Sequence, residues 1–261
     1  MKARDGVREP GGQTVEVLAV GAHPDDVELG CGGTLATLAA AGRRVGILHL
    51  TSGESGTRGT PELRRKEAQR AAGILGVVVV EFLDCGDGGL RRGSAEEDAV
   101  IAVLRRLRPE IVLGPTPADR HPDHGRAHHL VRDACFYAGL ARRGSGTAHR
   151  PGFVASYMQH DPFSPDFIVP VPASAWERKL AALDAYSSQI HRGGAAASGA
   201  GAAPATATKV SSPEFRAAME GRGRHFGNVV GAEFGEPFVT TLPLRIEDPA
   251  ALVAPGPAGL R

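Results

Sequence analysis

The sequence predicts an α/β fold: a Rossmann-like, mostly parallel sheet with helices on both faces, plus a smaller C-terminal α+β extension. The first observation is that apolar, β-type segments alternate with helical segments four times in the first half of the chain. The second is that the first strand is a nearly continuous apolar run, as in strands buried on both faces. The third is a length of 261 residues with 42% hydrophobic residues, which suffices for one α/β domain with its own core.

The first half of the chain contains four predicted strand–helix units. The strands are expected at residues 14–20, 44–50, 77–83 and 111–113. The helices are expected at residues 34–41, 61–75 and 94–107, and a fourth helix contains His124 and His128. The helix ends carry local signals, because Pro61 suits a first turn, Gly76 follows a last turn and Pro109 prevents continuation.

The second half is less regular and is expected to complete the same domain. Its predicted strands lie at residues 153–158, 167–171 and within 229–244, and its predicted helices at residues 172–189 and 212–225. Residues 193–208 contain only small or uncharged side chains, mostly Ala and Gly, which is typical of a flexible loop. We therefore interpret residues 14–245 as one domain between flexible tails at 1–13 and 246–261.

Composition and charge exclude several classes of protein. The formal net charge of +1 gives no overall positive field for nucleic acid or an acidic membrane surface. Three widely spaced cysteines do not indicate a disulfide framework. The N-terminal residues lack the apolar core of a secretory signal, and no apolar run reaches the roughly 18 residues of a membrane span. These features predict a cytoplasmic protein that binds neither nucleic acid nor membranes.

Two polar motifs follow predicted strands, HPDD at residues 23–26 and HPDH at residues 121–124. The carboxyl ends of parallel strands lie at one edge of a sheet, so the two motifs can converge there. Zinc binds imidazole nitrogen and carboxylate oxygen, and a catalytic site needs three protein ligands and one open position. Two ligands from one motif and one from the other would give that number, and the remaining acid would be free for proton transfer.

The sequence around these motifs resembles the PIG-L/LmbE-like zinc deacetylases. The superfamily resemblance rests on AHPDDVELGCGG at residues 22–33 together with HPDH at residues 121–124. Further segments are similar to one branch, the N-acetylglucosaminyl-malate deacetylases of bacillithiol biosynthesis: TPELRRKEA at 60–68, AYSSQ at 185–189 and RHFG at 224–227. The resemblance covers roughly residues 15–244.

The resemblance implies a hydrolase that removes the acetyl group from N-acetylglucosaminyl-malate and releases acetate. His23, Asp26 and His124 would bind one zinc ion per chain. The partner would be a small amino-sugar substrate, and relatives indicate a homo-oligomer, with hexamers among them.

The resemblance also implies roles for the remaining polar residues. Asp25 would accept a proton from the attacking water, and His121, oriented by Asp123, would stabilise the oxyanion or protonate the leaving amine. Arg64 would contact the substrate. The chain departs from many relatives at Phe234, where a tyrosine would be expected, and this puts a contribution of that tyrosine to oxyanion stabilisation in doubt.

Several alternatives remain open from the sequence. The substrate could be another N-acetylglucosamine conjugate, linked to inositol or part of a chitooligosaccharide, and mixed N/O ligands also suit iron, cobalt or manganese. His128, four residues after His124, is the second candidate ligand. A non-catalytic Rossmann-like protein that binds a sugar or nucleotide is the alternative of another class, although the glycines at 30, 32 and 33 do not form G-x-G-x-x-G. A purely structural zinc would need four protein ligands, and the motifs supply three.

Overall fold

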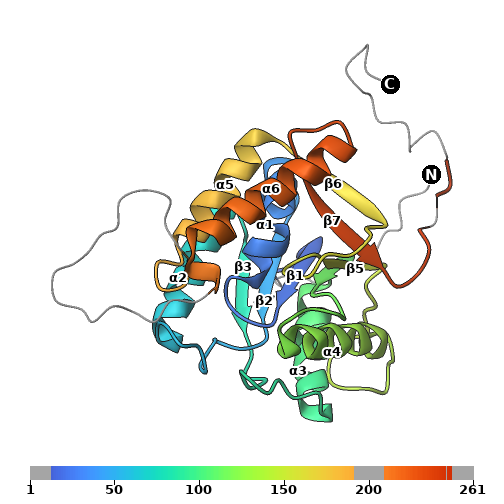
Figure 1. The fold of residues 1–261 in the computed structure, drawn as a ribbon. Helices are drawn as coiled ribbons and strands as arrows, with labels where there is room; N and C mark the ends of the chain where they lie inside the picture. Colours follow the sequence, from blue (N-terminus) through green and yellow to red (C-terminus); the bar gives the residue numbers. More distant parts are fainter. Residues whose placement is uncertain (1–12, 191–208, 245, 249–261) are drawn as a thin grey trace.

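The structure is a computed structural model that describes residues 13–190, 209–244 and 246–248 (Figure 1). The expected flexible loop at 193–208 lies outside the described residues, as do nearly all of the two expected tails. None of the helices in the described ranges is long and apolar enough to cross a membrane.

Seven strands of the described chain form one sheet in the order β3-β2-β1-β4-β5-β7-β6. Their bounds are β1 Val17–Gly21, β2 Val45–His49, β3 Val79–Phe82, β4 Ile111–Gly114, β5 Phe153–Tyr157, β6 Phe167–Val171 and β7 Phe234–Thr240. The first five strands are parallel, whereas β7 is antiparallel to both β5 and β6. The predicted mostly parallel α/β sheet is therefore confirmed, and the C-terminal strands extend that same sheet.

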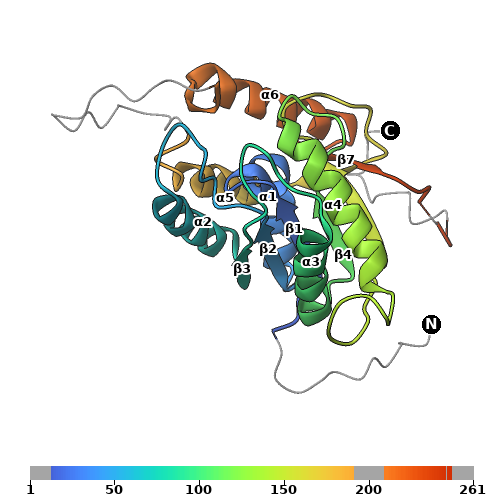
Figure 2. The ribbon, with the colours of Figure 1, turned by 90° about the horizontal axis from the view of Figure 1, so that it is seen from below.

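Helices cover both faces of the sheet (Figure 2). Their bounds are α1 Asp26–Ala40, α2 Pro61–Leu75, α3 Ser94–Leu107, α4 Pro122–Ala138, α5 Ala173–Asp184 and α6 Pro213–Val229, with a short 3₁₀ turn at Lys209–Ser211. Local sequence explains the ends of α2, because the Thr60 side chain accepts a hydrogen bond from the Leu63 N–H and Gly76 ends the helix at a φ of 81°.

The central strand β1 divides the apolar core into two clusters. Leu18 and Val20 pack with residues of α3 and α4. Val17 and Ala19 face the other way and pack with residues of α1 and α2. This alternation places apolar side chains on both faces of β1, which is why its sequence is continuously apolar.

Helix α1 starts earlier than the predicted helix at 34–41 and contains a break. It begins at Asp26 and has a non-helical residue at Cys31, with φ −140° and ψ 20°. The break leaves backbone groups on both sides without helical partners. Lys179 of α5 donates to the carbonyl of Leu29 at 2.9 Å, on the first side of the break.

Glu236 of β7 satisfies the second side of the same break. Its carboxylate accepts the backbone N–H groups of Gly33 at 3.0 Å and Thr34 at 2.6 Å. Lys179 and Glu236 also form an ion pair at 2.5 Å, with side chains only 2% and 3% exposed. The break in α1 is therefore held by residues about 150 to 200 positions away, which local sequence patterns do not predict.

The sheet order places the topological switch point between the neighbouring strands β1 and β4. The chain leaves β1 towards β2 on one side and leaves β4 towards β5 on the other, so the two connections run in opposite directions. Ligands of open α/β sheets bind outside the carboxyl ends of strands at such a point. The loops that follow β1 and β4 carry the two polar motifs.

Candidate metal centre

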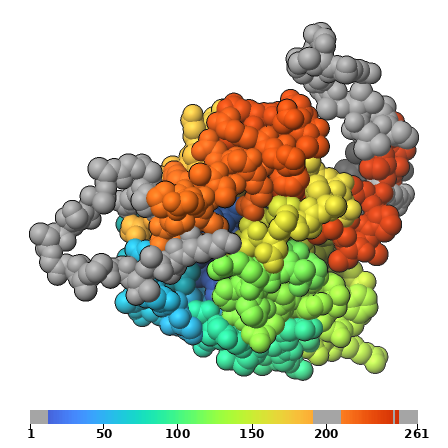
Figure 3. All heavy atoms as spheres, in the orientation of Figure 1, coloured from blue at the N-terminus to red at the C-terminus, as the bar shows by residue number. Residues whose placement is uncertain are grey.

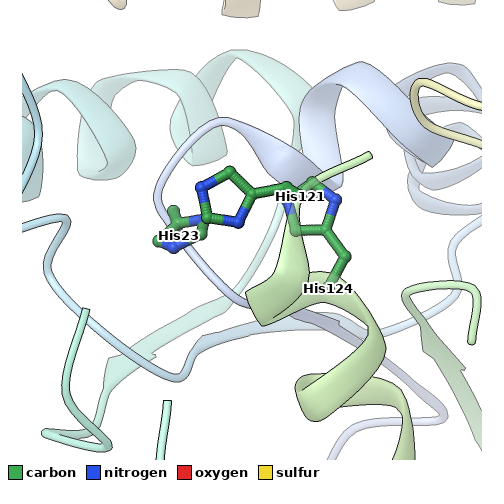
Figure 4. A group of neighbouring side chains, drawn as sticks. All are labelled: His23, His121 and His124. Atoms are coloured by element: carbon green, nitrogen blue, oxygen red, sulfur yellow. The ribbon is translucent and has the colours of Figure 1, made fainter. Parts of the chain in front are cut away.

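The two motifs meet as expected at the carboxyl edge of the sheet. His23 lies in the loop after β1, Asp26 is the first residue of α1, and His124 lies in the first turn of α4. Their exposed fractions are 7%, 3% and 2%. The His23 N–H donates to Asp26 Oδ2 at 2.8 Å, which fixes the conformation of the loop. Figure 4 shows the imidazoles of His23 and His124 grouped with that of His121.

The donor atoms converge around the Asp26 carboxylate. Asp26 Oδ2 lies 3.3 Å from His23 Nδ1, and Asp26 Oδ1 lies 3.3 Å from His124 Nε2. A tetrahedral ion with bonds of about 2.0–2.1 Å would hold its donor atoms roughly 3.3 Å apart. One nitrogen from each of His23, His121 and His124 also lies within 4.8 Å of the others. The nitrogen and oxygen donors suit a transition-metal ion, and the metal-type cluster found here among the described residues groups His23 and His124 with His121 and does not include Asp26.

Each of the two proposed histidine ligands has a carboxylate at its outer nitrogen. His124 Nδ1 lies 3.0 Å from Asp119 Oδ1. His23 Nε2 lies 2.9 Å from Asp87 Oδ1 and 3.5 Å from Asp123 Oδ2. Such carboxylates fix the orientation of an imidazole ligand and increase its basicity. Asp87 and Asp119 are absent from the predicted site, and the only available signal was their position in loops after β3 and β4.

The field of these carboxylates favours a cation in the centre. Burial alone would lower the pKa of His124, but Asp26 and Asp119 outweigh it and raise that pKa to about 9. Burial is likewise outweighed at His23, whose pKa is raised by Asp123, Asp26 and Asp87. A field that holds protons on two buried imidazoles also favours a divalent cation in their place.

Asp25 lies beside the cluster in an uncommon backbone conformation. Its φ is 99°, a region that non-glycine residues rarely adopt, and it immediately precedes α1. Strained conformations of this kind are concentrated at functional sites. Burial raises the pKa of Asp25 to about 7, although the Arg64 guanidinium opposes the shift. A carboxylate with a pKa near neutrality suits general-base chemistry.

Arg64 supports the loop that carries Asp25. Its guanidinium donates to the carbonyl of Pro24 at 2.7 Å and to that of Gly53 at 3.2 Å, and lies 3.7 Å from the Asp25 carboxylate. A Cβ at residue 53 would lie 1.8 Å from Arg64 Nη1, so only glycine allows this close approach. The side chain is 5% exposed. We expected Arg64 to contact substrate, and these contacts support instead a role in positioning Asp25.

His121 is oriented differently from the expected pairing with the Asp123 carboxylate. His121 precedes α4, and its Nδ1 accepts the backbone N–H of Asp123 at 3.2 Å. The Asp123 carboxylate instead accepts the N–H groups of Gly88 at 2.8 Å and Leu90 at 3.0 Å, and pairs with Arg126 at 2.8 Å. His121 and Asp123 are close in sequence, but the backbone N–H groups of Gly88 and Leu90 in the loop after β3 occupy the Asp123 carboxylate, and the sequence did not reveal this.

The protonation of His121 follows from this arrangement. Burial lowers its pKa, and the positive charges of His23 and His124 lower it further, which outweighs the opposite effect of Asp123. Because Nδ1 accepts a hydrogen bond, we assign the proton of the neutral ring to Nε2.

Two residues after β5 complete the cluster and were missed from the sequence. Gln159 Nε2 donates to Asp26 Oδ1. The His160 ring stacks on that of His124 with centroids 5.6 Å apart, and its backbone N–H donates to Asp119 Oδ2 at 3.0 Å. Neither belongs to a recognisable motif, and only their position at the carboxyl end of a parallel strand could have indicated them.

Two other residues considered from the sequence lie elsewhere. Phe234 is 4% exposed and stacks on Trp176 with ring centroids 4.4 Å apart, so its ring contributes to the apolar core. His128 Nδ1 lies 3.0 Å from the carbonyl of Pro115 and 3.2 Å from Ser156 Oγ. His128 is not part of the metal-type clusters found within the described ranges.

The carboxylate behind His124 gives a testable prediction. We expect Asp119→Asn to weaken metal binding by about 10- to 100-fold, because the imidazole loses its charged partner. Competition with a chromophoric chelator measures this affinity, and Asp84→Asn, at an exposed residue after β3, is the matched control. Equal affinities of the two variants would show that Asp119 does not support the ligand.

Comparisons with known proteins give consistent results. The family model described as PIG-L, GlcNAc-PI de-N-acetylase, matches residues 18–135. Diacetylchitobiose deacetylase of Thermococcus kodakarensis is 34% identical over 200 residues, covering 70% of this chain and 73% of the relative. The 4-oxalmesaconate hydratase of Pseudomonas putida is 30% identical over 198 residues, covering 67% of this chain and 74% of the relative.

A solved structure has the same fold. The conserved protein TT1542 from Thermus thermophilus superposes with a TM-score of 0.78 and 38% sequence identity. The match covers 89% of this chain and 97% of that protein.

Proposed function

The chain belongs to the PIG-L family, and on this premise we propose that it is a zinc-dependent hydrolase that removes the N-acetyl group of an N-acetylglucosamine conjugate. One observation carries the proposal: His23, Asp26 and His124 converge at the sheet edge with the buried Asp25 beside them. Three nitrogen or oxygen ligands leave a zinc ion with an open position, as catalytic sites require.

In the proposed reaction, zinc activates the water and the carbonyl, and Asp25 transfers the proton. Zinc, when bound, polarises a carbonyl and lowers the pKa of water to about 7. Asp25 accepts a proton from the attacking water and passes it to the nitrogen of the leaving amine. The C–N bond then breaks, giving acetate and the free amino sugar.

His121 stabilises the negative charge that develops on the carbonyl oxygen. Its Nδ1 is occupied by the N–H of Asp123, so a neutral ring presents Nε2–H as the donor. A neutral donor held in place by the start of a helix stabilises an oxyanion without itself titrating. Of the two roles that the sequence left open for His121, this geometry supports oxyanion stabilisation.

The candidate substrates differ in the group that is linked to N-acetylglucosamine. The sequence resemblance favours N-acetylglucosaminyl-malate, whereas the similarity to diacetylchitobiose deacetylase favours a chitooligosaccharide. An inositol-linked N-acetylglucosamine is the third candidate. All three share the N-acetylglucosamine amide on which the proposed mechanism acts.

A second candidate reaction has support from one relative. The similarity to 4-oxalmesaconate hydratase suggests addition of water to an unsaturated carboxylic acid. Such a reaction would also need a general base beside the attacking water. Loss of the ultraviolet absorbance of the conjugated acid, without release of any amine, would favour this candidate.

Removal of the metal tests the proposed function. We expect purified protein to release amine from N-acetylglucosaminyl-malate, diacetylchitobiose or the inositol conjugate. Release should cease after treatment with a chelator and return when zinc is added, because the three ligands hold the ion required for attack. Activity that survives complete metal removal would contradict the proposal.

A further inference from the structure

A cavity of about 500 Å³ lies next to the candidate metal centre, between the segment after β5 and helix α6. This volume is within the roughly 300–1,000 Å³ typical of small-molecule sites. The cavity is lined by Met158, Gln159, His160, Pro162, Phe215, Ala218, Met219, Gly221, Arg222, His225 and Phe226. In Figure 3 the orange atoms of α6 lie next to the yellow atoms of the chain that follows β5.

The cavity shares two lining residues, Gln159 and His160, with the surroundings of the metal centre. Gln159 donates to Asp26, and the His160 ring stacks on that of His124. Arg222 of α6 donates to the backbone carbonyl of Gln159, which ties the helix to the wall of the centre. A substrate whose amide lies at the metal can therefore extend into this space.

The lining away from the metal is mainly apolar. Met158 and Met219 are 1% and 5% exposed, and Phe215 and Phe226 are partly buried. The acetyl group that the proposed reaction removes is far too small to fill the cavity. Methionine and phenylalanine side chains bind alkyl and aromatic groups. The polar lining residues besides Gln159 and His160 are Arg222, whose guanidinium donates to the Gln159 carbonyl, and His225.

We propose that this cavity, which we call the α6 pocket, binds an apolar substituent of the amino-sugar substrate. This inference rests on the proposed function and deepens it, because it names an apolar substituent, in contrast to the polar malate, sugar and inositol groups considered above. The substituent could be the group linked to the anomeric carbon or a longer N-acyl chain. Both are apolar groups attached within reach of the same amide.

Two series of substrates show whether the apolar substituent is the group on the anomeric carbon or the N-acyl chain. The first contains methyl, butyl and hexyl glycosides of N-acetylglucosamine, and the second contains methyl glucosaminides with acetyl, butanoyl and hexanoyl groups on nitrogen. We expect kcat/KM for amine release to rise on the order of tenfold from the shortest to the longest member of one series. The series that rises identifies the group that occupies the α6 pocket.

Neighbouring alanines of α6 supply matched variants. Ala218 lines the α6 pocket, whereas Ala217 does not, and both are exposed. Ala218→Glu introduces a charge at the pocket wall, so the gain from the longer substituent should fall to about twofold or less. Ala217→Glu should retain the full gain. An equal loss in both variants would overturn the location of the pocket.

A binding measurement separates failure of this inference from failure of the proposed function. Calorimetry on the zinc-loaded Asp25→Asn variant gives the affinity of the same compounds without turnover. If the affinity rises with substituent length but the wild-type protein hydrolyses none of these compounds, the α6 pocket is supported and the proposed reaction is rejected. Turnover with no change in kcat/KM or affinity along either series would reject the pocket and retain the reaction.

Discussion

Replacing Asp25 by asparagine should lower kcat by about two to four orders of magnitude, because the attacking water loses its proton acceptor. Asparagine keeps the size of the side chain and tolerates the positive φ of 99° at this position. The variant should therefore fold normally and retain its zinc. A strong effect on kcat without loss of metal would assign Asp25 to proton transfer rather than to the structure of the loop.

Three measurements on the Asp25→Asn variant separate a catalytic effect from loss of zinc or of the fold. Single-turnover or steady-state kinetics gives kcat, elemental analysis gives the zinc content, and thermal unfolding shows whether the fold is intact. Asp161→Asn, at an exposed position, is the matched control and should retain full activity. A loss of less than about tenfold in the Asp25 variant would be inconsistent with general-base catalysis.

Replacing Lys179 by methionine should lower the free energy of unfolding by about 3–5 kcal/mol. The substitution leaves Glu236 as a buried charge without its partner and leaves the Leu29 carbonyl without its donor. Denaturation in urea measures the change. Lys66→Met, at an exposed residue of α2, is the matched control and should change stability by less than about 1 kcal/mol.

A second variant tests whether the charge is the cause. Adding Glu236→Gln to Lys179→Met removes the unpaired carboxylate, so the double variant should recover part of the lost stability. If the double variant is no more stable than Lys179→Met alone, the loss comes from packing around the methionine and not from the unpaired charge.

Local sequence patterns predicted most of the fold because most elements are specified locally. The ends of α2 and α3 agree with the predicted bounds, since a capping threonine, a first-turn proline and following glycine or proline residues lie next to them. The first part of α1 was missed because the break that separates it from the rest of the helix is held by Lys179 and Glu236, far along the chain. No window of neighbouring residues contains that information.

The candidate site shows the same division between local and distant information. Both motifs were recognised because each places histidine and acid side chains directly after a strand. Asp87, Asp119 and Gln159 were missed because each is a single polar residue in a loop, and only the folded sheet edge brings it to the motifs. The direction of the Asp123 carboxylate also depends on a loop more than thirty residues away.

The break in α1 has a consequence for how the protein matures during synthesis. All the proposed metal ligands lie in the first half of the chain, yet Glu236, which holds the second part of α1, lies in the last strand. A nascent chain still attached to the ribosome before β7 emerges lacks this support. A polypeptide truncated before β7 would therefore carry every proposed ligand, while the second part of α1 would lack the carboxylate that accepts its first N–H groups.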